Sequence, residues 1–185
     1  SDVTPATLDS ITYHDWTTND AGFAHHNYYG FGAVDADAAV SAAASYTNFG
    51  LGDEQSTADY SNCYKSVGGA YLNELSNLYL RFQDGDGCVN GTVEFVKVRI
   101  RAELEGSASY TTGIRLRSPS GTYATLLQPY SWTSDELGVS QYTYFATSAF
   151  YGESASGEWR LYFFDHAANG DQIYIYDAGL KFYYR

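Results

Sequence analysis

The chain is short of basic side chains, cysteine and proline, and it contains no methionine. Its 10 lysine and arginine residues stand against 22 aspartate and glutamate residues, which gives a formal net charge of −12. Such a charge repels phosphate groups, so we expect neither nucleic acid nor an anionic membrane surface as a partner. The sequence also lacks any apolar run close to the roughly 18 residues that a membrane-spanning helix needs.

The two cysteines are Cys63 and Cys88. An even pair in an acidic, tyrosine-rich chain favours a disulfide bond formed in an oxidising compartment, and two buried free thiols are the alternative. We therefore expect a secreted, extracellular and monomeric protein. The chain begins at Ser1 without an initiator methionine or a signal peptide, so we expect either a processed product or a fragment.

Apolar and aromatic residues are abundant by contrast. They make up 44% and 17% of the chain, and 19 residues are tyrosine. This content is enough for one sizeable core, and it favours β-structure because aromatic side chains suit a pleated, half-buried surface. Apolar and polar side chains alternate with period two in residues 78–82, 93–102, 114–117, 159–164, 173–176 and 180–184. Turn-forming residues separate these runs, which predicts an all-β sandwich.

One helix is predicted ahead of these strands. Residues 36–44 are rich in alanine, the strongest helix former, and Asp35 precedes them as an N-cap. Asp37 adds a negative charge in the first turn, where the helix dipole favours it. We expect the helix to span about residues 35–45, and glycine, serine and acidic residues indicate a linker over residues 48–59.

Two groups of motifs carry a family resemblance, and the first lies around the predicted helix. Residues 16–22 (WTTNDAG) are followed by residues 29–36 (YGFGAVDA). They resemble the end of the catalytic domain in kexin- and furin-like subtilases, where W-x-x-N-x-A-G precedes Y-G-(F/Y)-G-x-V-(D/N)-A. In that family the glycine–aromatic turn leads into the last helix of the catalytic domain.

The second group lies in the alternating region. Residues 116–122 (LRSPSGT) resemble the L-x-S-P-x-G-T signature of the P domain, also called the Homo B domain. Pro119 and Gly121 are the residue types that such a tight turn requires. Residues 151–165 (YGESASGEWRLYFFD) resemble the W-G-E…G-x-W-x-L-x-V-x-D pattern of the same family, with Tyr151 where tryptophan is usual.

The resemblance implies a fold and a domain organisation. It implies a jelly-roll-like antiparallel β-sandwich over residues 60–185, preceded by a remnant of a subtilase catalytic domain over residues 1–47. We expect Trp16, Tyr28 and Phe31 of this remnant, together with Val34, to be buried against the sandwich, which is their only apolar partner in the chain.

The resemblance also implies a role. The parent enzyme would hydrolyse peptide bonds with a Ser-His-Asp triad, but no match to the nucleophile motif G-T-S-x-x-x-P occurs here. We therefore predict no catalytic residue in this chain. Its expected partner is the catalytic subtilase domain of the same parent chain. It would stabilise that domain while both are folded, and it would modulate access of the substrate.

Calcium is the cofactor that the acidic loops favour, because this ion takes oxygen ligands. If the sandwich resembles its relatives, some loop carboxylates should converge near one of its ends. The candidate ligands are Asp135, Glu153, Asp165, Asp171 and Asp177, with Asp84 and Asp86 as a second cluster. Solvated surface is the alternative for every acidic cluster in so acidic a chain. The four histidines lack convergent partners, so we expect no transition-metal site.

Tyrosines near the end of the chain suggest a second function. Tyr174, Tyr176 and Tyr183 are candidates for a flat platform that stacks on sugars or packs on collagen-like substrates. The chain would then be an independent substrate-binding module for collagen or polysaccharide. The alternative is that these side chains merely suit a β-sheet or pack on the catalytic domain.

Overall fold

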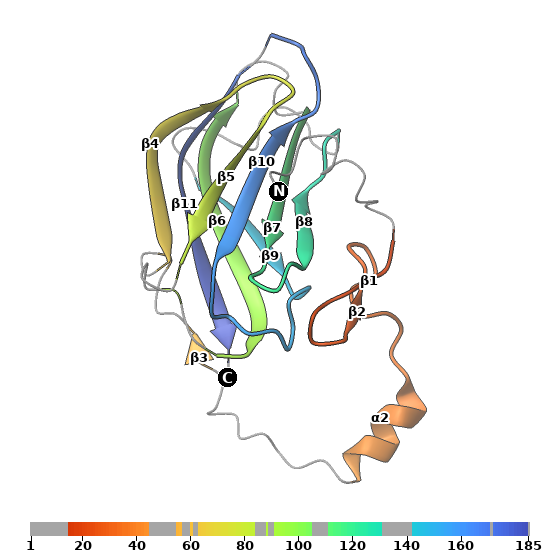
Figure 1. Cartoon of the computed structure of the whole chain (residues 1–185). Coiled ribbons are helices and arrows are strands. Elements are labelled where there is room, and N and C mark those ends of the chain that lie inside the picture. Colours follow the sequence, from red (N-terminus) through yellow and green to blue (C-terminus); the bar gives the residue numbers. More distant parts are fainter. Residues whose placement is uncertain are drawn as a thin grey trace.

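The computed structural model describes residues 15–44, 55–56, 60, 63–83, 88, 91–104, 111–130, 142–170 and 172–184. Two antiparallel sheets face one another as a sandwich, and a short helix lies to one side of them (Figure 1). The predicted β-sandwich with a preceding helix is thus confirmed. Within these ranges no helix has both the length and the apolar character that crossing a membrane requires.

Each described strand pairs antiparallel with its neighbours. One sheet has the order β5-β10-β7-β8, the other has the order β3-β11-β6-β9 with β4 also on β11, and β1 pairs with β2. The elements are β1 Thr17–Thr18, β2 Ala24–His25, α2 Ala36–Ala43, β3 Gln55–Ser56, β4 Tyr64–Leu72, β5 Asn77–Phe82, β6 Val93–Leu104, β7 Thr112–Arg117, β8 Tyr123–Leu127, β9 Thr143–Thr147, β10 Trp159–Asp165 and β11 Ile173–Tyr184.

The core lies between the two sheets, and the long strand β11 contributes to it along its whole length. Ile173 and Ile175 are buried in the first part of β11, and Leu180 and Phe182 in the second. These two pairs would point to opposite faces in a regular strand. A bulge between Ile175 and Asp177 shifts the register by one residue, so both pairs face the core.

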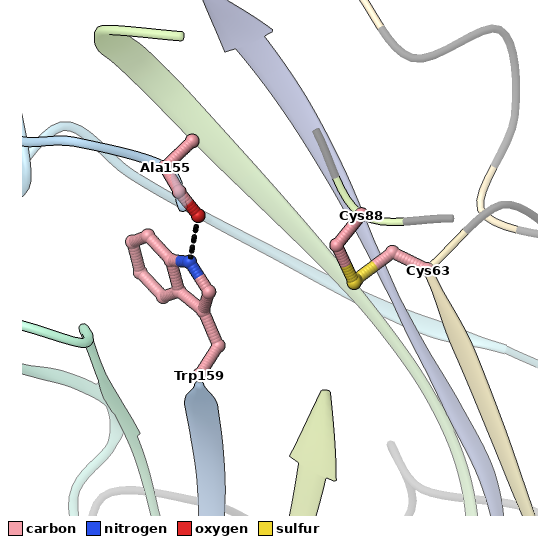
Figure 2. The surroundings of a disulfide bond; sticks show 4 residues. All are labelled: Cys63, Cys88, Ala155 and Trp159. Atoms are coloured by element: carbon pink, nitrogen blue, oxygen red, sulfur yellow. Dashed lines mark hydrogen bonds between the residues drawn. A yellow bond between two sulfur atoms is a disulfide. The ribbon is translucent and has the colours of Figure 1, made fainter. Parts of the chain in front are cut away.

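Trp159 opens strand β10 in the middle of the core. Its ring meets the rings of Phe150 and Phe182 edge-on, with centroids 4.9 and 5.1 Å away. The buried indole Nε1 donates a hydrogen bond of 2.8 Å to the carbonyl oxygen of Ala155 (Figure 2). The tryptophan of the P-domain signature is therefore a core residue with its one polar atom satisfied.

Strand β10 is also buried on its outer face. Tyr162 and Phe164 form a smaller cluster there with Tyr79 and Tyr123. Arg115 of the neighbouring strand β7 is fully buried on this side, and its Cζ lies 5.4 Å from the ring centroid of Phe164. Alternation places Arg115 on the outer face but does not show that aromatic rings cover it.

The predicted disulfide joins Cys63 to Cys88 (Figure 2). It links the residue before β4 to the segment between β5 and β6, and both cysteines are buried. The carbonyl oxygen of Cys63 also accepts a hydrogen bond from the backbone N–H of Leu180, at 2.8 Å. This hydrogen bond holds the residue before β4 beside β11, and the disulfide ties the same residue to the segment before β6.

Several strands were not predicted, because their side chains do not alternate cleanly. In β4 the alternation is broken by Gly68 and Gly69, both of which have positive φ. Strand β9 lies at a sheet edge and has no fully buried side chain. Gln55 and Ser56 fall inside the predicted linker, yet they pair with the end of β11 as strand β3.

We expect removal of the disulfide to weaken the fold. The bond closes a loop between residues 25 positions apart. In the chain-entropy picture its loss costs about 3–4 kcal/mol of the free energy of unfolding. The double variant Cys63→Ala/Cys88→Ala, followed by urea denaturation, measures this difference. An unchanged midpoint and slope would contradict the stabilising role.

Candidate functional site

Residues 15–34, which we call the strap, cross the outside of the sandwich ahead of helix α2 (Figure 1). Strands β1 and β2 form a small hairpin within it. The backbone N–H of Gly22 donates to the carbonyl oxygen of Asn19, and Gly22 has a φ of +86°, which glycine adopts without strain. The motif W-x-x-N-x-A-G, residues 16–22, therefore forms the first strand of the hairpin and its turn.

Asn19 anchors this hairpin to the sandwich. Its side chain is 4% exposed, and its Nδ2 donates to the carbonyl oxygens of Ala149 and Tyr151, at 3.0 and 2.9 Å. Its Oδ1 accepts from the backbone N–H of Phe23, at 2.9 Å. One amide thus closes the turn of the strap and holds it against the turn that follows β9.

Glu153 makes the second anchor and is 2% exposed. Its Oε1 accepts from the backbone N–H of Asp20, at 3.0 Å, and from the hydroxyl of Thr122. Its Oε2 accepts from the hydroxyl of Ser120, at 2.7 Å. Three donors compensate the burial of the carboxylate. The strap, the S-P-S-G-T turn and the G-E turn therefore meet at one side chain, and we call this meeting point the junction.

Apolar contacts surround the polar junction. The ring of Phe23 lies edge-on to Tyr151, with centroids 5.1 Å apart, and Phe31 lies 5.9 Å from the same ring. These three residues border a hollow of about 480 Å³. Gly152 permits the close approach, since a Cβ there would lie 2.9 Å from both the Cβ of Ala21 and a ring carbon of Phe23.

The expected burial of the apolar strap residues is wrong. Trp16, Tyr28 and Phe31 are each about half exposed or more, and Val34 is 88% exposed. The reason is geometric. The strap contacts the sandwich through its turn, through Asn19 and through the edges of Phe23 and Phe31 on Tyr151, so much of its aromatic surface remains exposed.

Helix α2 continues this exposed surface. Asp35 caps it as predicted, because its Oδ1 accepts from the backbone N–H of Ala38 at 2.9 Å. The helix spans only eight residues, and none of its side chains is buried. Val40 is 73% exposed. The strap and α2 therefore present an apolar surface that the sandwich does not cover.

The predicted calcium ligands are not brought together within the described residues. Glu153 lies in the junction. Asp165 accepts from the hydroxyl of Thr111 at 2.8 Å, and Asp177 pairs with Arg101, whose Nη2 lies 2.6 Å from its Oδ2. No group of three or more potential metal ligands occurs in the part of the chain that the structure describes. The other candidates, Asp84, Asp86, Asp135 and Asp171, lie outside these ranges, so calcium stays a prediction.

The candidate tyrosines separate into two places. Tyr174 and Tyr176 are neighbours, with ring centroids 4.7 Å apart. Tyr183 lies nine positions further along β11, about 30 Å away at the usual rise of a strand. The Nζ atoms of Lys97 and Lys181 each lie 5.3 Å from the centroid of the Tyr183 ring.

Sequence reasoning named Glu153 only as a calcium candidate, and it did not single out Asn19 as an anchor. Both residues stand in motifs that the sequence marked. Their roles depend on contacts between residues more than 100 positions apart, which no local pattern reveals.

We expect Asn19→Ala to release the strap. The change removes the donor from the buried carbonyl oxygen of Ala149 and from the partly buried one of Tyr151, which costs about 2 kcal/mol. Hydrogen exchange at strap amides should accelerate by about 30-fold, while exchange in β6 and β10 stays unchanged. Asp20→Asn is the matched control, because Asp20 contacts the junction through its backbone N–H. Equal strap protection in Asn19→Ala and the native chain would refute the anchor.

The strap should also loosen in acid. His25 is buried, and this burial, reinforced by the neighbouring His26, lowers the pKa of His25 below the ordinary 6.5. The detached strap binds a proton more readily than the docked one. The stabilisation is therefore complete above pH 6.5 and is lost as the pH falls through the lowered pKa.

Nuclear magnetic resonance of strap amides between about pH 7.5 and 5 measures this loss. We expect His25→Gln to flatten the dependence, whereas His166→Gln, on the sandwich, should preserve it. A pH-independent strap in the native chain would be the contrary result.

Comparison with known proteins places the sandwich in a family. Residues 94–182 match the family described as "Proprotein convertase P-domain". The chain is 30% identical over 162 residues to human proprotein convertase subtilisin/kexin type 7. The aligned part makes up 87% of this chain and 20% of that protein. It is 24% identical over 179 residues to a PC3-like endoprotease of Hydra vulgaris, covering 95% of this chain and 24% of that protein. It thus spans a quarter or less of these curated relatives.

A solved structure shares the fold. The chain superposes on the serine protease of Aeromonas sobria with a TM-score of 0.72 at 20% identity, covering 95% of this chain and 34% of that one. In proteases of this kind the P domain is a non-catalytic part of a longer chain. The match over residues 94–182 agrees with the S-P-S-G-T and G-E motifs that meet at the junction and with the antiparallel sandwich, because all three are features of a P domain. Residues 94–182, which form most of the β-sandwich, are therefore a proprotein convertase P domain.

Proposed function

We propose that the sandwich is the stabilising P domain of a secreted subtilisin-like serine endopeptidase, and that the strap and helix α2, as the end of its catalytic domain, dock on the remainder of that domain. The observation that carries this proposal is the uncovered apolar surface formed by Trp16, Tyr28, Phe31, Val34 and Val40. Soluble domains seldom leave several large apolar side chains of one segment exposed unless another surface covers them.

Helix α2 supports this proposal because it is too short to be stable by itself. An isolated helix needs about 12–15 residues to be even marginally stable in water, and α2 has eight residues with no buried side chain. Its N-cap adds only about 1 kcal/mol. A helix of this kind is expected to gain its stability from a tertiary contact, and a catalytic domain that precedes the sandwich would provide one.

The junction explains how docking would be transmitted to the sandwich. Asn19 and Glu153 fix the strap to the two turns through buried hydrogen bonds. A catalytic domain bound to the strap is then bound to the folded sandwich. Each part stabilises the other while both remain folded, which is the mass-action effect of any partner that binds only the native state. The same fixed geometry would limit how substrates approach.

Secretion and calcium dependence belong to the same proposal. The buried disulfide and the strongly acidic surface suit an extracellular compartment. No three described carboxylates, histidines or cysteines lie close enough together to hold a metal ion. A bound calcium ion would therefore involve Asp84, Asp86, Asp135 or Asp171, backbone oxygens, or ligands of the parent enzyme. No step of the proposed role depends on the ion.

The alternative of a collagen- or polysaccharide-binding module rests on Tyr174 and Tyr176. Their ring planes meet at 62°, and Tyr71 meets Tyr174 at 76°. Sugars stack on a flat platform of exposed ring faces, and these rings stand at steep angles to one another instead of lying in one plane. The geometry favours the stabilising role.

We expect Val40→Asp to destabilise the parent protease, in which the helix is docked, and to leave the 185-residue chain unaffected. In the 185-residue chain the variant should leave the midpoint of unfolding unchanged, because Val40 is exposed there. In the parent protease it should destabilise the docked pair by about 2–3 kcal/mol, since burial of a valine is lost and a charge would be buried. Thermal unfolding of both proteins measures the difference.

Ser41→Asp introduces the same charge one position along α2, at a side chain that is already polar. It should have a smaller effect on the parent than Val40→Asp. The docking proposal would be abandoned if Val40→Asp left the thermal stability and protease activity of the parent unaltered.

A further inference from the structure

A row of side chains crosses the outer face of the five-stranded sheet near the beginning of β11. Tyr174 is the register partner of Tyr71 on β4 and of Glu103 on β6. Tyr176, two positions further along β11, donates its hydroxyl hydrogen bond to Oε2 of Glu103 at 2.9 Å. With Gln172, these side chains line a hollow of about 240 Å³. We call it the tyrosine pocket.

The three rings stand as walls and are held in place. The centroids of Tyr71 and Tyr174 are 4.4 Å apart, and those of Tyr174 and Tyr176 are 4.7 Å apart, both in edge-to-face arrangement. Tyr174 lies against the bare backbone of Gly69, where a Cβ would come within 1.9 Å of the tyrosine oxygen. Tyr174, which contacts both other rings and the backbone of Gly69, therefore loses little conformational freedom when a ligand binds.

The outward side chains of β6 show which charge the pocket would accept. Lys97, Arg99 and Arg101 follow one another along this face, and each has its charged end over a tyrosine ring. The next outward position is Glu103. Among the described residues no cation lies over the rings of Tyr71 or Tyr174. A carboxylate thus stands where the series of cations ends.

The neighbouring arginine does not neutralise this carboxylate. Nη2 of Arg101 is paired with Oδ2 of the buried Asp177 at 2.6 Å, so that pair carries no net charge. The hydrogen bond to Glu103, followed by partial burial, raises the pKa of Tyr176. Arg101 lies over the ring of Tyr176, 5.4 Å from its centroid, so the negative side of the pocket is formed by Glu103 with the rings of Tyr71 and Tyr174.

We propose that the tyrosine pocket binds the cationic end group of a lysine or arginine side chain presented by a peptide or protein. The ammonium or guanidinium group would lie against the rings of Tyr71 and Tyr174 and pair with Glu103. Aromatic walls combined with a carboxylate recognise organic cations by the same attraction that holds the arginines of β6 over their tyrosines. This site is independent of the strap and of the docking proposed for it.

The test is a titration of the isotope-labelled 185-residue chain followed by nuclear magnetic resonance. The probes are Nα-acetyl-lysine amide, Nα-acetyl-arginine amide, the norleucine analogue, tetramethylammonium and a neutral cello-oligosaccharide. We expect saturable shifts at Tyr71, Glu103 and Tyr174 with the lysine or arginine derivative, decreasing with added salt. The norleucine analogue, which has the same apolar stem without the charge, should cause none.

Two variants test the residues directly. Glu103→Gln keeps an acceptor for Tyr176 and removes the charge, and we expect binding about 3- to 10-fold weaker. Tyr71→Leu should weaken binding to a similar degree, and because Tyr71 is 60% exposed the fold should be retained. Tyr144→Leu, at an exposed tyrosine of β9 outside the pocket, is the matched control and should bind as the native chain does.

Each contrary outcome rejects the proposal. Equal binding of the norleucine analogue would make the pocket an apolar one, and shifts with the oligosaccharide alone would make it a sugar site. Tighter binding of tetramethylammonium than of either amino-acid derivative would assign it to small quaternary ammonium compounds. An unchanged dissociation constant in Glu103→Gln, or no response to any probe, would remove the site.

Discussion

The buried carboxylate of Glu153 is the interaction on which the arrangement of this chain depends. A carboxylate at 2% exposure needs donors, and here they come from the strap, from Ser120 and from Thr122. Any movement of the strap away from the sandwich would leave part of this group without a partner. The polar junction therefore determines where the hairpin lies, while the surrounding aromatic side chains adapt to it. This is why the strap can be firmly attached and still expose most of its apolar surface.

The sandwich itself is held in a different way. Its inner faces pack around Trp159, and β11 runs along one sheet as a twelve-residue strand that pairs with β6, β4 and β3. On the outside of this sheet, tyrosine rings rather than carboxylates accompany most of the cations. Such contacts bury aromatic surface while they satisfy a charge, and they suit an acidic chain with few basic residues. The tyrosine pocket arises where this pattern ends.

Much of the fold could be predicted because its strands and helix follow from patterns among residues that are close in the sequence. Alternation located β5, β6, β7, β10 and β11, and the alanine-rich segment located α2 with Asp35 as its cap. The missing strands have particular causes. Gly68 and Gly69 bulge β4, β9 is an edge, and the two residues of β3 are too few to form a pattern. The candidate site was harder, because Asn19, Ser120 and Glu153 are far apart in sequence and meet only through the fold.

The sequence by itself determined the β-sandwich and the helix cap, and it indicated the P-domain resemblance, because periodicity, composition and motif spacing depend on neighbours along the chain. It favoured a bond between the two cysteines, which the structure then showed. The tertiary structure alone decided which side chains share an environment. It turned Glu153 into a junction residue, separated Asp165 from Asp177, covered Arg115 with an aromatic ring and placed Tyr71 beside Tyr174 and Glu103. Which side chains are buried and which pair with one another depends on how distant strands are aligned, and this register is not visible in the order of residues along the chain.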